Sequence, residues 1–122
     1  CYNPANLKFG VICVNDFGDA IFSPIYITFE ICPSVEPHFL GMQVMRWNFI
    51  NRALRFQQGT VYERTAVSPE DLLSMDILLP TIDIQRKLSN TVQVIAAKIS
   101  TAERMGERLS ELKSVLLRQL FI

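Results

Sequence analysis

Three short apolar segments have the pattern of β-strands. Residues 25–31 alternate apolar and more polar side chains, a period of two that is typical of a half-buried strand. Residues 9–15 are apolar, contain β-branched side chains and precede a turn-forming run. Residues 75–79 are apolar except for Asp76 and end before Pro80. We expect a strand at each of these segments.

Two other segments have helical patterns before Pro80. From about Pro37 to about Gln58, apolar residues recur every three or four positions, which predicts one amphipathic helix with Gly59 as its C-terminal stop. Ser68 precedes Pro69, Glu70 and Asp71. Because its hydroxyl can accept a bond from a free N–H group at a helix start, we expect Ser68 to cap a short helical turn.

The segment from about Thr81 to Leu120 predicts one long helix. An apolar stripe with steps of three or four residues runs along it: Leu88, Val92, Ile95, Ile99, Ala102, Met105, Leu109, Leu112, Leu116 and Leu120. Gly106 and Lys113 interrupt a strict heptad. A helix of roughly 40 residues extends about 60 Å, too far to bury its stripe on a domain of about 80 residues. We therefore expect residues 83–120 to pair with another helix, from a second copy or a second spacer.

These elements predict an α+β fold in two parts. Residues 1–80 would form a small mixed domain and residues 81–122 a coiled-coil-like helix. The formal net charge is zero, but it is −3 before Pro80 and +3 after it. No global field therefore recruits nucleic acid or an anionic membrane, and any such binding must come from a local patch.

Composition excludes several classes of protein. The apolar share of 49% suffices for a packed core, whereas no uncharged stretch reaches the length of a membrane span. We find no pattern of a secretory signal. The cysteines, Cys1, Cys13 and Cys32, are odd in number and lack CxxC spacing, which argues against a disulfide framework and a zinc site. We expect a cytoplasmic protein with free, incidental thiols and no cofactor.

No catalytic constellation is evident. The single histidine, His38, has no carboxylate pair or nucleophile motif beside it, and a structural role is the simpler interpretation. Motifs for binding nucleotides or catalytic zinc are absent as well. We therefore expect that the chain is not an enzyme.

The segment from Arg46 to Arg64, which is rich in arginine and side-chain amides, is the best candidate for a binding site. Guanidinium and amide groups pair with base edges, and the same arginines can hold phosphates. Alternatively, the polar residues of this segment are simply the solvated face of an amphipathic helix. The candidate DNA-binding residues are Arg46, Arg52, Arg55, Gln57, Gln58, Thr60, Tyr62 and Arg64.

Three pieces, in this order, resemble the specificity subunit of type I restriction-modification systems. They are the Ser-Pro strand of residues 21–29, the stretch from Gly59 to Pro80, and the long helix from Gln85 to the Leu-Lys and Leu-Leu pattern of residues 112–121. The family usually shows Glu-Gln at the start of this helix, whereas Ile84 precedes Gln85 here. The resemblance covers the C-terminal part of one target-recognition domain and one spacer helix, so we expect the chain to be part of a longer protein.

The resemblance implies a non-catalytic role in DNA recognition. In this family the recognition domains read the two halves of a split target, and the helices hold them apart while methyltransferase subunits dock alongside. The partners implied are double-stranded DNA and the methyltransferase (modification) subunits, with the helix interface formed by Leu88, Val92, Ile95, Ile99, Ala102, Leu109, Leu112 and Leu116. The alternative is a protein-interaction module that pairs through its helical stripe and binds no nucleic acid.

Overall fold

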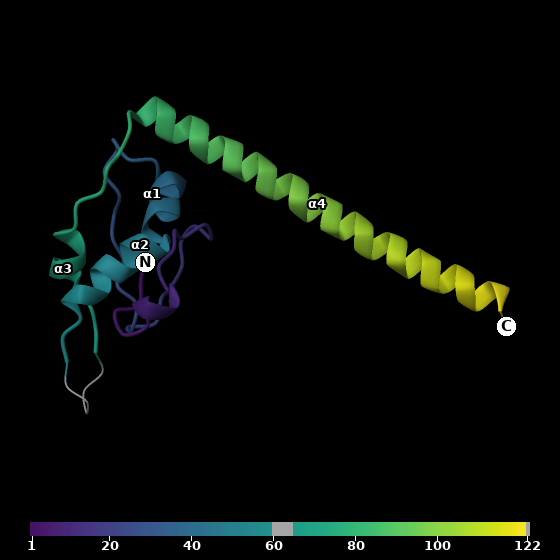
Figure 1. Cartoon of the computed structure of the whole chain (residues 1–122), viewed down its shortest axis with the longest axis horizontal. Helices are drawn as coiled ribbons and strands as arrows, with labels where there is room; N and C mark the ends of the chain where they lie inside the picture. The colour runs from purple at the N-terminus through teal and green to yellow at the C-terminus, as the bar shows by residue number, and fades with distance from the viewer. Residues whose placement is uncertain (60–64, 122) are drawn as a thin grey trace. The chain divides into compact units, whose positions relative to one another are not determined.

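The computed structural model describes residues 1–59 and 65–121, and the chain divides into two compact units, Cys1–Arg86 and Lys87–Ile122. Helices are the main regular elements of both units (Figure 1). Six are found in the described ranges: the 3-10 helices η1 (Leu7–Phe9) and η2 (Leu54–Phe56), and the α-helices α1 (Pro37–Val44), α2 (Trp47–Ala53), α3 (Pro69–Leu73) and α4 (Ile82–Leu120).

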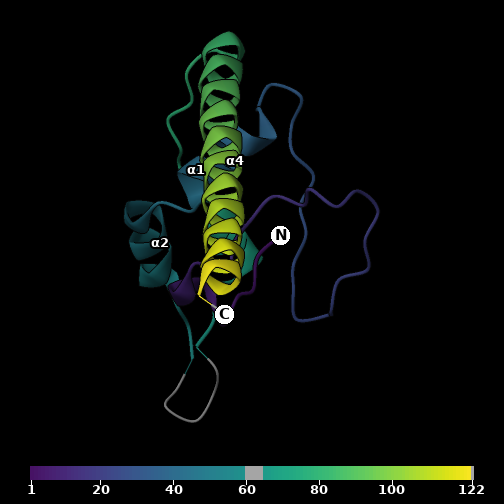
Figure 2. The same cartoon turned by 90° about the vertical axis from the view of Figure 1, so that its right-hand side faces the viewer.

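The α+β expectation is wrong, because the described residues form no sheet. Their only strand-like pairings are three isolated antiparallel bridges, Tyr2 with Ile12, Tyr2 with Ile27, and Gln58 with Ala66. None of the strands expected at residues 9–15, 25–31 and 75–79 forms. Figure 2 shows irregular backbone throughout the connection between η1 and α1, where two of them were expected.

The pairing ends early because the backbone turns at Asn3. Tyr2 and Ile27 exchange two backbone hydrogen bonds of 2.9 Å, and the Asn3 N–H donates to the Val11 carbonyl at 3.0 Å. The Oδ1 atom of Asn3 then accepts bonds from the N–H groups of Ala5 and Asn6, which bends the chain away. The period of two in residues 25–31 therefore produces alternating exposure without a ladder: residues 27, 29 and 31 are half-buried, and residues 28 and 30 are exposed.

The single helix expected over Pro37–Gln58 is also wrong, because it is divided at Arg46. The backbone of Arg46 is extended, with φ −67° and ψ 138°, and its carbonyl accepts the first bonds of α2 from Phe49 and Ile50. Neither proline nor glycine stands at this break. Gly59, with φ 143°, follows the bridge at Gln58 and does not end a helix.

Two sequence-based expectations about helices are confirmed. Ser68 caps α3, since its Oγ accepts a bond of 3.1 Å from the Asp71 N–H and donates to the Asp71 carboxylate at 2.8 Å. The segment after Pro80 forms α4, which is uninterrupted over its 39 residues. At 1.5 Å per residue, α4 is about 58 Å long.

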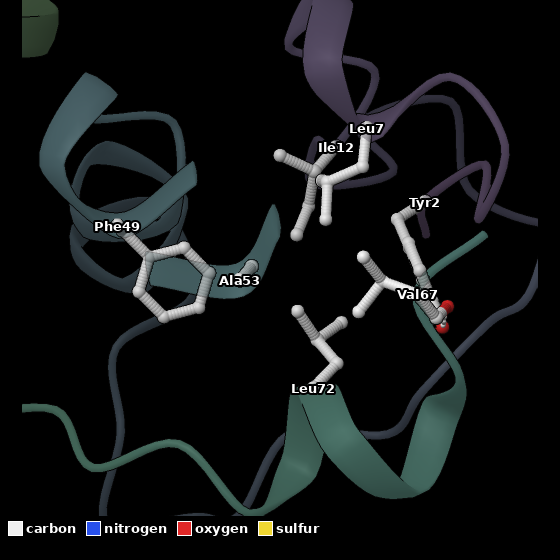
Figure 3. Packing of buried hydrophobic residues seen from close by; sticks show 7 residues of the cluster. All are labelled: Tyr2, Leu7, Ile12, Phe49, Ala53, Val67 and Leu72. Carbon is white, nitrogen blue, oxygen red and sulfur yellow. Dashed lines mark hydrogen bonds between the residues drawn. The ribbon is translucent and has the colours of Figure 1, made fainter. Parts of the chain in front are cut away.

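The core of the first unit joins segments that are far apart in the sequence. Seven buried side chains form one cluster: Tyr2, Leu7, Ile12, Phe49, Ala53, Val67 and Leu72 (Figure 3). They come from the N-terminal segment, α2 and the region of α3. The Tyr2 hydroxyl donates a hydrogen bond of 3.0 Å to the Val67 carbonyl, so its one polar group is satisfied inside the cluster.

A buried glutamine fixes the first turn of α4 within this unit. The Gln85 side chain is 2% exposed. Its Oε1 accepts a bond of 2.9 Å from the Glu36 N–H, and its Nε2 donates a bond of 2.8 Å to the Pro80 carbonyl. One side chain thus joins the N-terminal end of α1 to the chain that enters α4.

Candidate functional site

The arginine and amide segment centres on one side of α2 and η2. Phe49, Ile50 and Ala53 of α2 are buried, which anchors the helix in the core. The opposite side is exposed and carries Asn48, Asn51, Arg52 and Arg55. Their spacing of three and four residues is that of one helix face. Asn48 was not among the predicted site residues, although this spacing in the sequence could have revealed it.

Two of the arginines have partners within the unit. A guanidinium nitrogen of Arg52 donates to the Asp76 carbonyl at 3.2 Å, and the group lies 5.8 Å from the centre of the Phe49 ring. The Arg46 guanidinium donates to Oε1 of Gln43 at 3.3 Å. Both side chains remain exposed. These contacts hold two of the positive charges near the start and the end of α2.

Arg55 differs from both. It is exposed in η2, and within residues 1–59 and 65–121 its guanidinium has no hydrogen-bond or ion-pair partner. Of the three described arginines of the segment, it is therefore the most available to an external anion or base edge.

The two glutamines that follow have different surroundings. The Gln57 Nε2 donates to Oγ1 and to the carbonyl of Thr65, at 2.9 and 3.2 Å, so its amide joins the C-terminal end of η2 to Thr65. Gln58 is exposed and pairs with Ala66 through its backbone. Thr60, Tyr62 and Arg64 lie outside the described residues.

The apolar stripe of α4 is exposed along its length. Its large side chains are between 46% and 65% exposed at Leu88, Val92, Ile95, Ile99, Leu109, Leu112 and Leu116, and Ala102 is exposed with them. Among the described residues, the second unit consists of the part of α4 from Lys87 onward and Phe121. Because a single helix has no second element against which to bury a stripe, the unit by itself leaves the stripe in water.

The remaining candidate chemistry is sparse. The His38 Nε2 lies 3.7 Å from a carboxylate oxygen of Asp16, and the two side chains are 42% and 63% exposed, so this is a contact at the surface. Among the described residues, no three histidine, cysteine or carboxylate side chains group as metal ligands. In the same ranges, no helix has both the length and the apolar content to span a membrane.

The cysteines are arranged in a way that sequence reasoning missed. All three are free, but the Sγ atoms of Cys1 and Cys13 are 3.6 Å apart. Twelve positions separate these residues, and no CxxC spacing marks them. Only the pairing of residues 1–3 with residues 11–13 brings them together.

Comparison with known proteins gives no match to a family model, to a curated protein or to a solved structure.

Proposed function

We propose that the chain is a non-catalytic DNA sequence-recognition component of a type I restriction-modification complex, in which α4 acts as spacer and docking element for methyltransferase subunits. The observation that carries the proposal is the division of features between the two units. One unit presents an exposed face of arginine and amide groups, and the other is a long helix with an uncovered apolar stripe. The order of the three family-like segments adds support.

The exposed face of α2 and η2 has the chemistry that reads a duplex. Asn51 can pair with an adenine edge, and Arg55 can pair with guanine or hold a phosphate. Neither α2 nor η2 contains an acidic residue that would repel the DNA backbone. The contact would be local, because the net charge of the whole chain is zero.

The experiment is a titration of duplex DNA with the 122-residue chain over a range of salt concentrations, read by fluorescence anisotropy. Replacing Arg55 by alanine should weaken binding by about 1–3 kcal/mol if the arginine reads a base. If it holds a phosphate, the same change should reduce the salt slope by about one unit and weaken all sequences alike.

Lys8→Ala provides a matched control. It removes one exposed positive charge from the same unit at a position outside the segment, so it should leave affinity and slope nearly unchanged. If Arg55→Ala and Lys8→Ala reduced the DNA affinity equally, binding would depend only on the overall charge of the unit, and the proposed site would be wrong.

The second candidate is a protein-interaction module that pairs through α4. It is favoured by the zero net charge and by the exposed stripe. A chain that associates through α4 with little dependence on salt, and that binds no duplex at low salt, would support this module instead.

A further inference from the structure

Cys1 and Cys13 face each other in a hydrogen-bonded antiparallel pair. The Cys1 nitrogen lies 2.9 Å from the Cys13 carbonyl oxygen, and the Cys13 N–H donates to the Cys1 carbonyl at the same distance. Their Sγ atoms lie 3.6 Å apart, which is contact distance for two sulfur atoms. Both thiols therefore lie on one side of the same backbone pair.

The backbone of this pair is held in place by its neighbours. The next pair, Tyr2 and Ile12, is in the core, where the side chains are 1% and 8% exposed. Opposed residues of a hydrogen-bonded antiparallel pair have Cα atoms about 5.5 Å apart, inside the range of roughly 4.4–6.8 Å that a disulfide spans. A bond between the sulfurs thus needs rotation of side chains but no movement of the core.

We propose that Cys1 and Cys13 form a reversible thiol–disulfide site that responds to a peroxide. Exposed Cys13 is the thiol that the oxidant reaches first, and half-buried Cys1 is the thiol that resolves the product. Cys32 has no sulfur neighbour among the described residues and takes no part in the reaction.

The reaction balances with hydrogen peroxide as the oxidant. The Cys13 thiolate attacks one peroxide oxygen, the O–O bond breaks, and a sulfenic acid forms as the other oxygen leaves as water after taking a proton. The Cys1 thiolate then attacks the Cys13 sulfur, the S–S bond forms and the S–O bond breaks, and the departing hydroxide takes up the proton that the Cys1 thiol released and leaves as a second water. Two thiols are oxidised and one peroxide is reduced to two waters, and a dithiol reductant reverses the change.

Closing this bond changes the first unit locally. The ring would enclose residues 1–13, which include η1 and the buried side chain of Leu7. The disulfide would hold residues 1–3 paired with residues 11–13, so these two segments could no longer fray apart. The site therefore couples the redox state to the order of the N-terminal part of the core.

The test treats the full chain with one equivalent of hydrogen peroxide and counts thiols, followed by peptide mapping by mass spectrometry without reduction. The expected product has lost two of its three thiols, contains a link between Cys1 and Cys13, retains the thiol of Cys32 and regains all three thiols with dithiothreitol. Cys32→Ser should give the same link. A link that includes Cys32, or oxidation of Cys13 beyond the sulfenic acid while Cys1 stays free, would overturn the proposal.

A trapping experiment separates the two roles. With Cys1→Ser no resolving thiol is present, so dimedone should label the sulfenic acid of Cys13 at least about tenfold more than in the wild-type chain, since an adjacent thiol acts at high effective concentration. Equal labelling of the two proteins would show that Cys1 does not resolve the intermediate. Because both variants replace sulfur by oxygen at a partly exposed or exposed position, they should fold as the wild type does.

Discussion

Gln85 is the residue on which the entry to α4 depends. Its Oε1 accepts a hydrogen bond from the Glu36 N–H, and its Nε2 donates one to the Pro80 carbonyl. The side chain itself is buried. A buried amide with both ends satisfied tolerates little change, since a backbone group that loses its partner retains its desolvation cost.

We expect Gln85→Glu to lower the free energy of unfolding of the first unit by on the order of 2 kcal/mol, because it removes the donor to Pro80 and places a carboxylate beside that carbonyl. Urea unfolding followed by the fluorescence of Trp47, which lies in α2, measures this change. Gln119→Glu makes the same substitution at an exposed position of α4 and should change stability by less than about 0.5 kcal/mol. Similar values for the two variants would contradict a role for the buried amide.

Tyr2 predicts a loss of stability at high pH. Burial, followed by the nearby carboxylates of Glu70 and Asp71, raises the pKa of Tyr2 to about 12 from its ordinary value of 10.0. The folded chain therefore keeps this proton where the unfolded chain has lost it. The contribution of the Tyr2 hydroxyl to the free energy of unfolding is complete below about pH 10. It is lost as the pH rises toward 12, by at most about 1.4 kcal/mol per pH unit.

Tyr2→Phe isolates this effect. At neutral pH the variant should be less stable by about 1 kcal/mol, because the Val67 carbonyl loses its hydrogen bond. Above about pH 10 the difference in the free energy of unfolding between the two proteins should shrink, since phenylalanine does not titrate. Urea titrations at several alkaline pH values measure the difference, and a constant difference would mean that Tyr2 ionises equally in both states.

At the scale of elements, α1 depends on a close approach at Gly41. A Cβ added there would lie 2.9 Å from Cγ2 of Val14, inside normal contact distance. Alanine favours a helix over glycine by about 1 kcal/mol, so the contact and the helix preference oppose each other. Because a valine side chain is stiff and Gly41 is buried, we expect the contact to dominate.

Gly41→Ala should therefore destabilise the first unit by about 1–2 kcal/mol. In a Val14→Ala background the same substitution should be neutral, or stabilise the unit by up to about 1 kcal/mol, because the obstructing methyl group is gone. Thermal or urea unfolding of the four proteins of this double-mutant cycle gives the coupling energy. If the effects of the two substitutions were additive, contact with Val14 would not be the reason that Gly41→Ala destabilises the unit.

The elements also show which part of the fold the sequence could predict. α3 and α4 were predictable, because a serine cap and a long period of three to four residues are local signals. The strands were not, because a period of two describes which side chains share a face, and a ladder also needs a partner segment of matching length. The division at Arg46 has no local signal either, because neither proline nor glycine stands there and the apolar period of three to four residues continues across it.

The same distinction applies to the candidate sites. The arginine and amide face could be read from composition and helical spacing, although Asn48 was overlooked. The meeting of Cys1 with Cys13 and the bond between Gln85 and Glu36 depend on tertiary pairing over twelve or more positions, which no local pattern encodes.

At the scale of the whole molecule, we expect the second unit to determine how the chain associates. Each large side chain of the α4 stripe gains roughly 1.5–3 kcal/mol when it is fully buried, so an uncovered stripe strongly favours association. Glu103, Arg104, Glu107 and Arg108 lie around residue 104, the midpoint between Leu88 and Leu120. In an antiparallel pair with a second copy, charges of opposite sign would therefore meet near the centre of the interface and help to set its orientation.

We accordingly expect the chain to self-associate through α4. Ile99→Asp combined with Leu109→Asp should dissociate the assembly, because it places two charges on the stripe, while the fluorescence of Trp47 in the first unit stays unchanged. Ser100→Asp combined with Ser114→Asp adds the same charge at exposed positions beside the stripe and should leave the mass of the assembly intact. Sedimentation equilibrium measures the mass, and circular dichroism checks that α4 remains formed. A wild-type chain that is monomeric at concentrations well above about 100 μM, which corresponds to an association weaker than about −5.5 kcal/mol, with α4 intact, would rule out self-pairing and assign the stripe to a different protein.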